Sequence, residues 1–78
     1  MNTSELYSQL ADILDVDSVE ADAVLRDFDA WDSLSVLSIL AMVDTNFGVT
    51  VAPQDLAKAS TAAELAKIIE EKIAARGS

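Results

Sequence analysis

Ser33 is the residue of this chain whose surroundings point most clearly to chemistry. It lies in the segment FDAWDSLSVL, residues 28–37, where a loop is followed by a strongly apolar helical run. We predict that its hydroxyl faces water in the first turn of a helix, beside the Asp32 carboxylate. The chain contains no His and no Cys, so Ser33 lacks the base that usually activates a serine nucleophile. A serine so placed, without catalytic machinery, is expected to be modified by another enzyme.

The helix that follows Ser33 has the clearest pattern in the chain. It is predicted over residues 33–47 and ends at Gly48, since glycine tolerates the positive φ common just after a helix. One face carries the expected core residues Val36, Ile39, Leu40, Val43 and Phe47. A second apolar stripe holds Leu34, Leu37 and Ala41. This stripe either packs against the preceding loop or remains available to a partner.

The rest of the chain also has helical periodicity. Residues 3–15 carry apolar side chains three and four positions apart, which predicts an amphipathic helix. Pro53 favours the first turn of a short helix that continues through residues 54–58. The last helix is predicted to begin at a capping box formed by Thr61 and Glu64, and to point Leu65, Ile68, Ile69 and Ile73 inward. Residues 76–78 should fray.

These elements define the expected fold class. We predict an all-α protein, a small four-helix bundle with three longer helices and one short helix. Residues 49–51 (VTV) have no pairing candidate and are expected to be an extended link. Residues 16–32 form a long loop, which we expect Leu25 and Phe28 to anchor against the bundle; Trp31 should pack there too or touch a partner.

Composition restricts the function further. The 78 residues suggest a single domain over 1–78, and the net charge of −9 disfavours nucleic acids and anionic membranes as partners. The acidity favours basic protein partners. No signal peptide or membrane span is visible, so we expect a cytoplasmic protein. The apolar surface left over after folding is small, so we expect a monomer.

The arrangement around Ser33 resembles the acyl carrier protein family. The resemblance rests on Asp32-Ser33-Leu34 after a long loop, on the helix that ends at Phe47-Gly48, and on the Thr61 helix start; it extends from about Leu6 to Ile73. It implies that Ser33 carries a 4′-phosphopantetheine arm derived from coenzyme A, with Asp32 and Leu34 beside it. The arm's thiol would hold acyl groups as thioesters. We hypothesise that Asp32 also helps the modifying enzyme orient its magnesium and the coenzyme A diphosphate.

The resemblance also implies partners, and here the sequence departs from the family. The implied partners are a phosphopantetheinyl transferase, an acyl-loading synthetase and acyl-transferring enzymes. Family members usually carry acids on the second helix, whereas this chain has Asp44 alone there, with Ser35, Ser38, Ala41, Thr45 and Asn46 at the other positions. We therefore expect a specialised stand-alone carrier for a dedicated pathway, such as one that makes a surface polysaccharide, a lipid or a secondary metabolite (a polyketide, for example). Its partner face would comprise Trp31, Leu37, Ala41 and Asp44.

Other functions are open to test. An enzyme is disfavoured because no base accompanies Ser33. The acids after the first helix lack the spacing, the central glycine and the closing glutamate of a calcium-binding loop, so no specific metal site is predicted. Within the carrier class, the cargo could be an amino acid, as on a peptidyl or D-alanyl carrier. Outside that class, the alternative is an unmodified helical interaction module, which would not need the Ser33 hydroxyl.

Overall fold

The computed structural model describes residues 2–76, which form four α-helices and one turn of 3₁₀ helix, with no strand among them. The elements are α1 (Thr3–Leu14), η1 (Leu25–Asp27), α2 (Ser33–Phe47), α3 (Pro53–Lys58) and α4 (Ala62–Arg76). The all-α fold with three longer helices and one short helix is therefore confirmed. The link at residues 49–51 belongs to neither a helix nor a strand.

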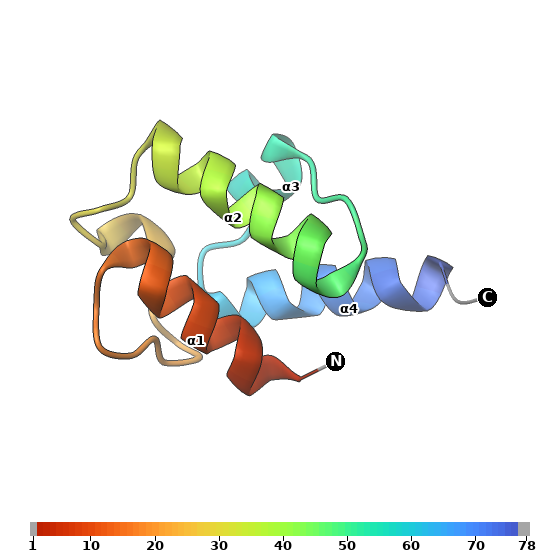
Figure 1. The fold of residues 1–78 in the computed structure, drawn as a ribbon, viewed down its shortest axis with the longest axis horizontal. Helices are drawn as coiled ribbons and strands as arrows, with labels where there is room; N and C mark the ends of the chain where they lie inside the picture. The colour runs from red at the N-terminus through yellow and green to blue at the C-terminus, as the bar shows by residue number, and fades with distance from the viewer. Residues whose placement is uncertain (1, 77–78) are drawn as a thin grey trace.

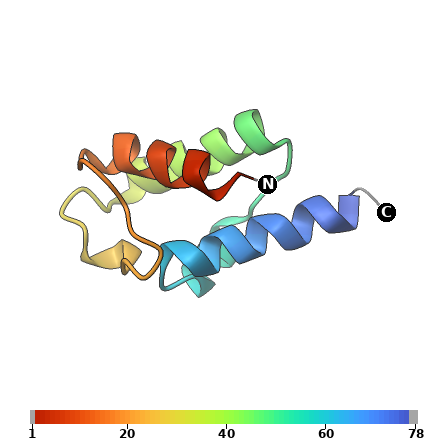
Figure 2. The same ribbon diagram turned by 90° about the horizontal axis from the view of Figure 1, so that it is seen from below.

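The helices pack around one apolar core, and α2 contacts each of the other three (Figure 1). Seen from below, α1 and α2 lie above α4 (Figure 2). Burying one such large apolar side chain contributes about 1.5–3 kcal/mol to stability. The largest fully buried side chains are Leu6, Leu10, Leu14, Leu25, Ile39, Val43, Leu56, Leu65 and Ile69.

The core face of α2 differs from the prediction. Ile39 and Val43 are fully buried, but Val36, Leu40 and Phe47 are only half-buried against the core. Met42 and Ser35 are buried in their place. Ser35 can face the interior without an unpaired polar group because its hydroxyl is hydrogen-bonded to the backbone at the start of α2.

The long loop between α1 and α2 is tied to the start of α4. The carbonyl oxygens of Ala21 and Ala23 accept hydrogen bonds from the N–H groups of Ala63 (2.9 Å) and Ala62 (3.1 Å). These are among the first N–H groups of α4, which have no partner inside the helix. Leu25 is fully buried, as expected of an anchor, whereas Phe28 is only half-buried.

Two predictions about α4 need correction. Thr61 Oγ1 accepts from the Glu64 N–H (3.2 Å), but the Glu64 carboxylate accepts from the Ser60 N–H (2.9 Å) rather than from Thr61. Arg76 does not fray: it lies in the last turn of α4 and its guanidinium donates to the Gly48 carbonyl oxygen at 2.6 Å. The predicted fraying of residues 77–78 lies outside the described residues.

The turn after α2 generates a stability prediction. Gly48 has φ +70°, and a Cβ there would lie 2.6 Å from Arg76 Nη1. We expect Gly48→Ala to lower the free energy of unfolding by about 1–2 kcal/mol, since an L-residue is strained in the left-handed region. Urea unfolding is the measurement. In an Arg76→Ala background the loss should be smaller, because only the backbone strain remains; an unchanged unfolding curve for Gly48→Ala would contradict the assignment.

Candidate functional site

Ser33 is the first residue of α2 and is exposed, as predicted. Its hydroxyl makes no hydrogen bond within residues 2–76. Its N–H and that of Leu34 are likewise without a carbonyl partner there, as expected for the first N–H groups of a helix. The side chain is therefore presented to solvent at the positive end of a helix of 15 residues.

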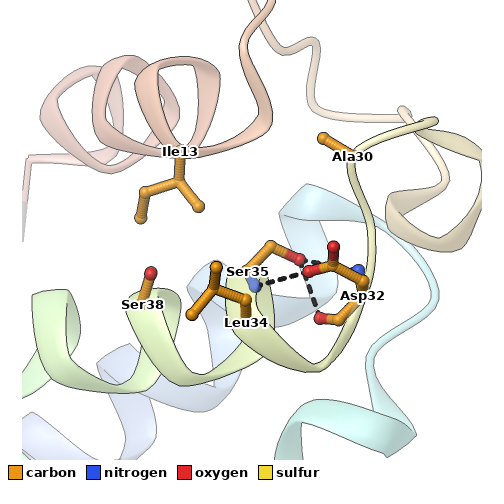
Figure 3. Close-up of a pocket in the computed structure, with 6 residues that line it drawn as sticks. All are labelled: Ile13, Ala30, Asp32, Leu34, Ser35 and Ser38. Atoms are coloured by element: carbon orange, nitrogen blue, oxygen red, sulfur yellow. Dashed lines mark hydrogen bonds between the residues drawn. The ribbon is translucent and has the colours of Figure 1, made fainter.

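A reciprocal cap fixes the backbone on either side of Ser33 (Figure 3). The Asp32 carboxylate accepts a hydrogen bond from the Ser35 N–H at 2.8 Å. In return, Ser35 Oγ accepts from the Asp32 N–H and donates to the Asp32 carbonyl oxygen, both at 2.9 Å. The role of Ser35 was not predicted, although an N-cap residue followed three positions later by a hydrogen-bonding side chain is a helix-start signal.

A groove borders Ser33 on the side of α3. Its volume is about 500 Å³, within the roughly 300–1,000 Å³ usual for small-molecule sites. The walls come from the end of the loop, from α2 and from the start of α3, and are mainly apolar. The lining residues are Trp31, Asp32, Ser33, Val36, Leu37, Leu40 and Pro53.

Charged side chains connect α3, whose start forms one wall of this groove, to α4 and to η1. Lys72 on α4 forms an ion pair with Asp55 on α3 at 3.2 Å. The same carboxylate accepts from the Ala52 N–H at 3.2 Å, and this hydrogen bond and then Lys72 lower the pKa of Asp55 below its ordinary value. Arg26 of η1 donates to the Ala57 carbonyl oxygen at the other end of α3.

A smaller depression, which we call the notch, lies on the opposite side of the α2 N-terminus. Figure 3 shows the Ile13 side chain of α1 pointing toward α2 across it. Its volume is about 270 Å³. Its lining residues are Ile13, Ala30, Asp32, Leu34, Ser35 and Ser38.

The second apolar stripe of α2 is on the surface. Leu34 is 72% exposed and Leu37 is 62% exposed, and Ala41 and Asp44 are exposed too. Packing of this stripe against the loop is therefore excluded. Among the predicted site residues, those that line the groove together with Ser33 are Trp31, Asp32 and Leu37. Leu34 lines the notch. Ala41 and Asp44 line neither depression.

The site suits a phosphate ester more than a metal. Within residues 2–76 no group of three or more acidic side chains is arranged to hold a metal ion. The free N–H groups at the start of α2 favour an anion, and the exposed hydroxyl of Ser33 lies beside them. The residues present therefore fit a group attached through a phosphodiester. No helix among the described residues is long and apolar enough to span a membrane.

Comparisons with known proteins agree with this geometry. Residues 4–69 match the model of the family described as "Phosphopantetheine attachment site". The fold is similar to the solution NMR structure of the holo acyl carrier protein from Geobacter metallireducens, with a TM-score of 0.78 and 24% identity over 95% of this chain and 87% of that chain. Comparison with curated protein sequences finds no significant match.

The chain therefore belongs to the phosphopantetheine-attachment family. It has the fold of an acyl carrier protein, and its family consists of carriers of a phosphopantetheine prosthetic group rather than enzymes. Carrier domains of this kind interact with phosphopantetheinyl transferases and with the enzymes of their pathways.

The reciprocal cap generates a prediction about Asp32. Asparagine caps a helix about as well as aspartate, whereas alanine lacks the acceptor. We expect Asp32→Asn to leave the free energy of unfolding near the wild-type value and Asp32→Ala to lower it by about 0.5–2 kcal/mol. Urea unfolding of the two variants in parallel is the measurement, and equal stabilities would show that the hydrogen bond to Ser35 contributes nothing.

Proposed function

We propose that Ser33 is the residue that carries the phosphopantetheine arm. The observation that supports this most directly is its position: an exposed, unpartnered hydroxyl at the start of α2, on the border of the groove. Ser35, two residues away, is buried and its hydroxyl is used in the cap. Ser38 is exposed but lies a full turn inside the helix, away from the free N–H groups.

Attachment is a substitution at phosphorus, in which one bond to oxygen forms and another breaks. Ser33 Oγ bonds to the pantetheine-side phosphorus of coenzyme A as the bond to the bridging diphosphate oxygen breaks. Adenosine 3′,5′-bisphosphate leaves, and the hydroxyl proton passes to a base of the transferase. The attached arm supplies a thiol that carries acyl groups as thioesters.

The chain's own residues orient this site. The α2 N-terminus stabilises the negative phosphodiester through its partial positive charge. The groove extends from Ser33 along Val36, Leu37 and Leu40 toward Pro53, so the arm has an apolar surface to lie on. The Asp32 carboxylate has one oxygen engaged by Ser35 and is exposed, which leaves the other to help the transferase orient magnesium and the coenzyme A diphosphate.

Intact-mass measurement tests the attachment site. The purified protein is incubated with coenzyme A, Mg²⁺ and a broad-specificity phosphopantetheinyl transferase. We expect one added phosphopantetheine on the wild type and on the matched control Ser38→Ala, and none on Ser33→Ala. Asp32→Asn, which retains the cap, should be modified more slowly because the charge is lost. Modification of Ser33→Ala would exclude Ser33, and a normal rate for Asp32→Asn would exclude the role of Asp32.

The carrier serves a dedicated pathway rather than general fatty-acid synthesis. Support comes from the outer face of α2, where Asp44 is the only acid and the exposed side chains include Leu34, Leu37 and Ala41. This face of α2 therefore offers little negative charge to fatty-acid synthase enzymes that dock through basic patches. The apolar stripe is suited to partners with apolar docking patches, and the loop acids steer basic ones at long range. The cargo is an acyl group; an aminoacyl cargo is the second candidate.

A transfer assay tests this assignment. With the malonyl transferase of a bacterial fatty-acid synthase, we expect kcat/KM for the holo protein to be at least about tenfold below that for the synthase's own carrier, equivalent to about 1.4 kcal/mol. Ala41→Glu/Asn46→Glu should recover part of the loss. Ala63→Glu/Ala75→Glu adds the same charge on α4 and should recover none. Equal kcat/KM for the two carriers would contradict a dedicated role.

A further inference from the structure

The two depressions beside Ser33 suit different occupants. The groove borders Ser33 itself, whereas the notch borders its neighbours Asp32 and Leu34 on the side of α1. An arm attached to Ser33 would therefore have the groove directly beside its point of attachment. The notch remains open beside the modified residue.

The notch has the size and lining of a receptor for one apolar side chain. Its volume of about 270 Å³ is just below the range of about 300–1,000 Å³ for small-molecule sites. Its apolar walls are Ile13 of α1, Ala30 of the loop and the largely exposed Leu34 of α2, so three separate elements border this open depression. The Ser35 hydroxyl is already satisfied in the cap, which leaves Ser38 as the polar hydroxyl available at the rim.

The surroundings of the notch are uniformly acidic. Ala30 is shared with an adjoining depression of about 400 Å³ that is also lined by Asp15, Asp27 and Asp29. The sequence has no Lys or Arg in residues 1–25 or 27–57. The intervening Arg26 donates its guanidinium to the Ala57 carbonyl oxygen at α3. A protein that seats an apolar side chain in the notch thus meets carboxylates next to it and is favoured if it carries Lys or Arg there.

The position of the notch, beside the first turn of α2, indicates which partner enzyme would contact it. The enzyme that modifies Ser33 must bring a reacting phosphorus to its hydroxyl, so it must cover the first turn of α2. An enzyme that acts on the far end of the arm has no such constraint. We infer that the notch is the docking site of the phosphopantetheinyl transferase, which inserts one apolar side chain between Ile13 and Leu34 and places Lys or Arg against Asp15 and Asp29. This inference rests on the proposed modification of Ser33.

Filling the notch tests the apolar contact. Ser38→Leu places an aliphatic side chain in the notch without altering the core, since Ser38 is exposed. Thr45→Leu is the matched control: it is exposed, on the same helix and two turns further along the same face. In initial-rate assays with the broad-specificity transferase, we expect Ser38→Leu to raise KM for the carrier about tenfold with kcat unchanged, which is the signature of lost docking. Thr45→Leu should match the wild type.

Removing charge tests the electrostatic contact. Asp15→Asn/Asp29→Asn neutralises two carboxylates of the adjoining depression, and asparagine tolerates the positive φ of 58° at position 15. Glu70→Gln/Glu71→Gln removes the same charge from exposed positions on α4. We expect the first pair to raise KM severalfold more than the second at low salt. The difference should disappear as NaCl rises from about 0.01 M to about 1 M, because the screening length falls from about 30 Å to about 3 Å.

The outcomes separate this inference from the proposed function. If the wild type gains a phosphopantetheine at Ser33 while Ser38→Leu and Thr45→Leu behave alike, the docking inference is wrong and the carrier function stands. If the wild type carries no phosphopantetheine as purified and gains none on incubation, both are wrong. Backbone amide shifts give a second readout: on addition of transferase without coenzyme A, amides in residues 13–16 and 27–38 should shift and those in residues 62–76 should not.

Discussion

The connection between α1 and α2 is the constraint on which the rest of the structure depends. It spans residues 15–32 with only one turn of 3₁₀ helix, and its few internal hydrogen bonds leave other backbone groups that need partners elsewhere. Its carbonyl groups at Ala21 and Ala23 find partners in the N–H groups that α4 leaves open at its start. Leu25, fully buried, fills the core at the same level. One set of contacts thus completes a helix end, closes the bundle and brings the chain to Asp32 at the start of α2.

The few basic residues explain why the surface charge is so uneven. Arg26, Lys72 and Arg76 each bond to another element, at Ala57, Asp55 and Gly48 respectively. Three of the five cations in the chain therefore connect α3, α4 and the turn after α2 to their neighbours. Most of the acids, by contrast, lie on α1 and in the loop, where none of them forms an ion pair with another residue in the described range 2–76. The fold thereby separates a structural use of positive charge from a surface that attracts cationic proteins.

Much of this architecture could be predicted from local patterns. Helical periodicity, the Gly48 terminator and Pro53 were sufficient to locate α1, α2 and α3, and the exposed position of Ser33 followed from the start of α2. Rotation about a helix axis was harder to predict, because Ser35 is polar by type and yet buried by virtue of its cap. The Glu64 carboxylate binds the N–H of Ser60, one residue before the predicted partner Thr61. Arg76 is held by Gly48, which is distant in sequence, so its position could not be predicted from local patterns. The groove and the notch each need walls from three elements, and no local pattern specifies those.

The surfaces on the two sides of Ser33 bear on the proposed carrier function. If Ser33 carries the arm, it must remain reachable by enzymes while the arm and its cargo stay in contact with the protein, and two depressions allow these needs to be met separately. Here α2 divides the surface: Val36, Leu37 and Leu40 line the side toward α3, and Leu34 and Ser38 line the side toward α1. Because residues three and four apart share a face of a helix, these sets project in different directions from the same turns. The hydrogen bonds between Asp32 and Ser35 fix the first turn of α2, and therefore the direction in which the Ser33 side chain points.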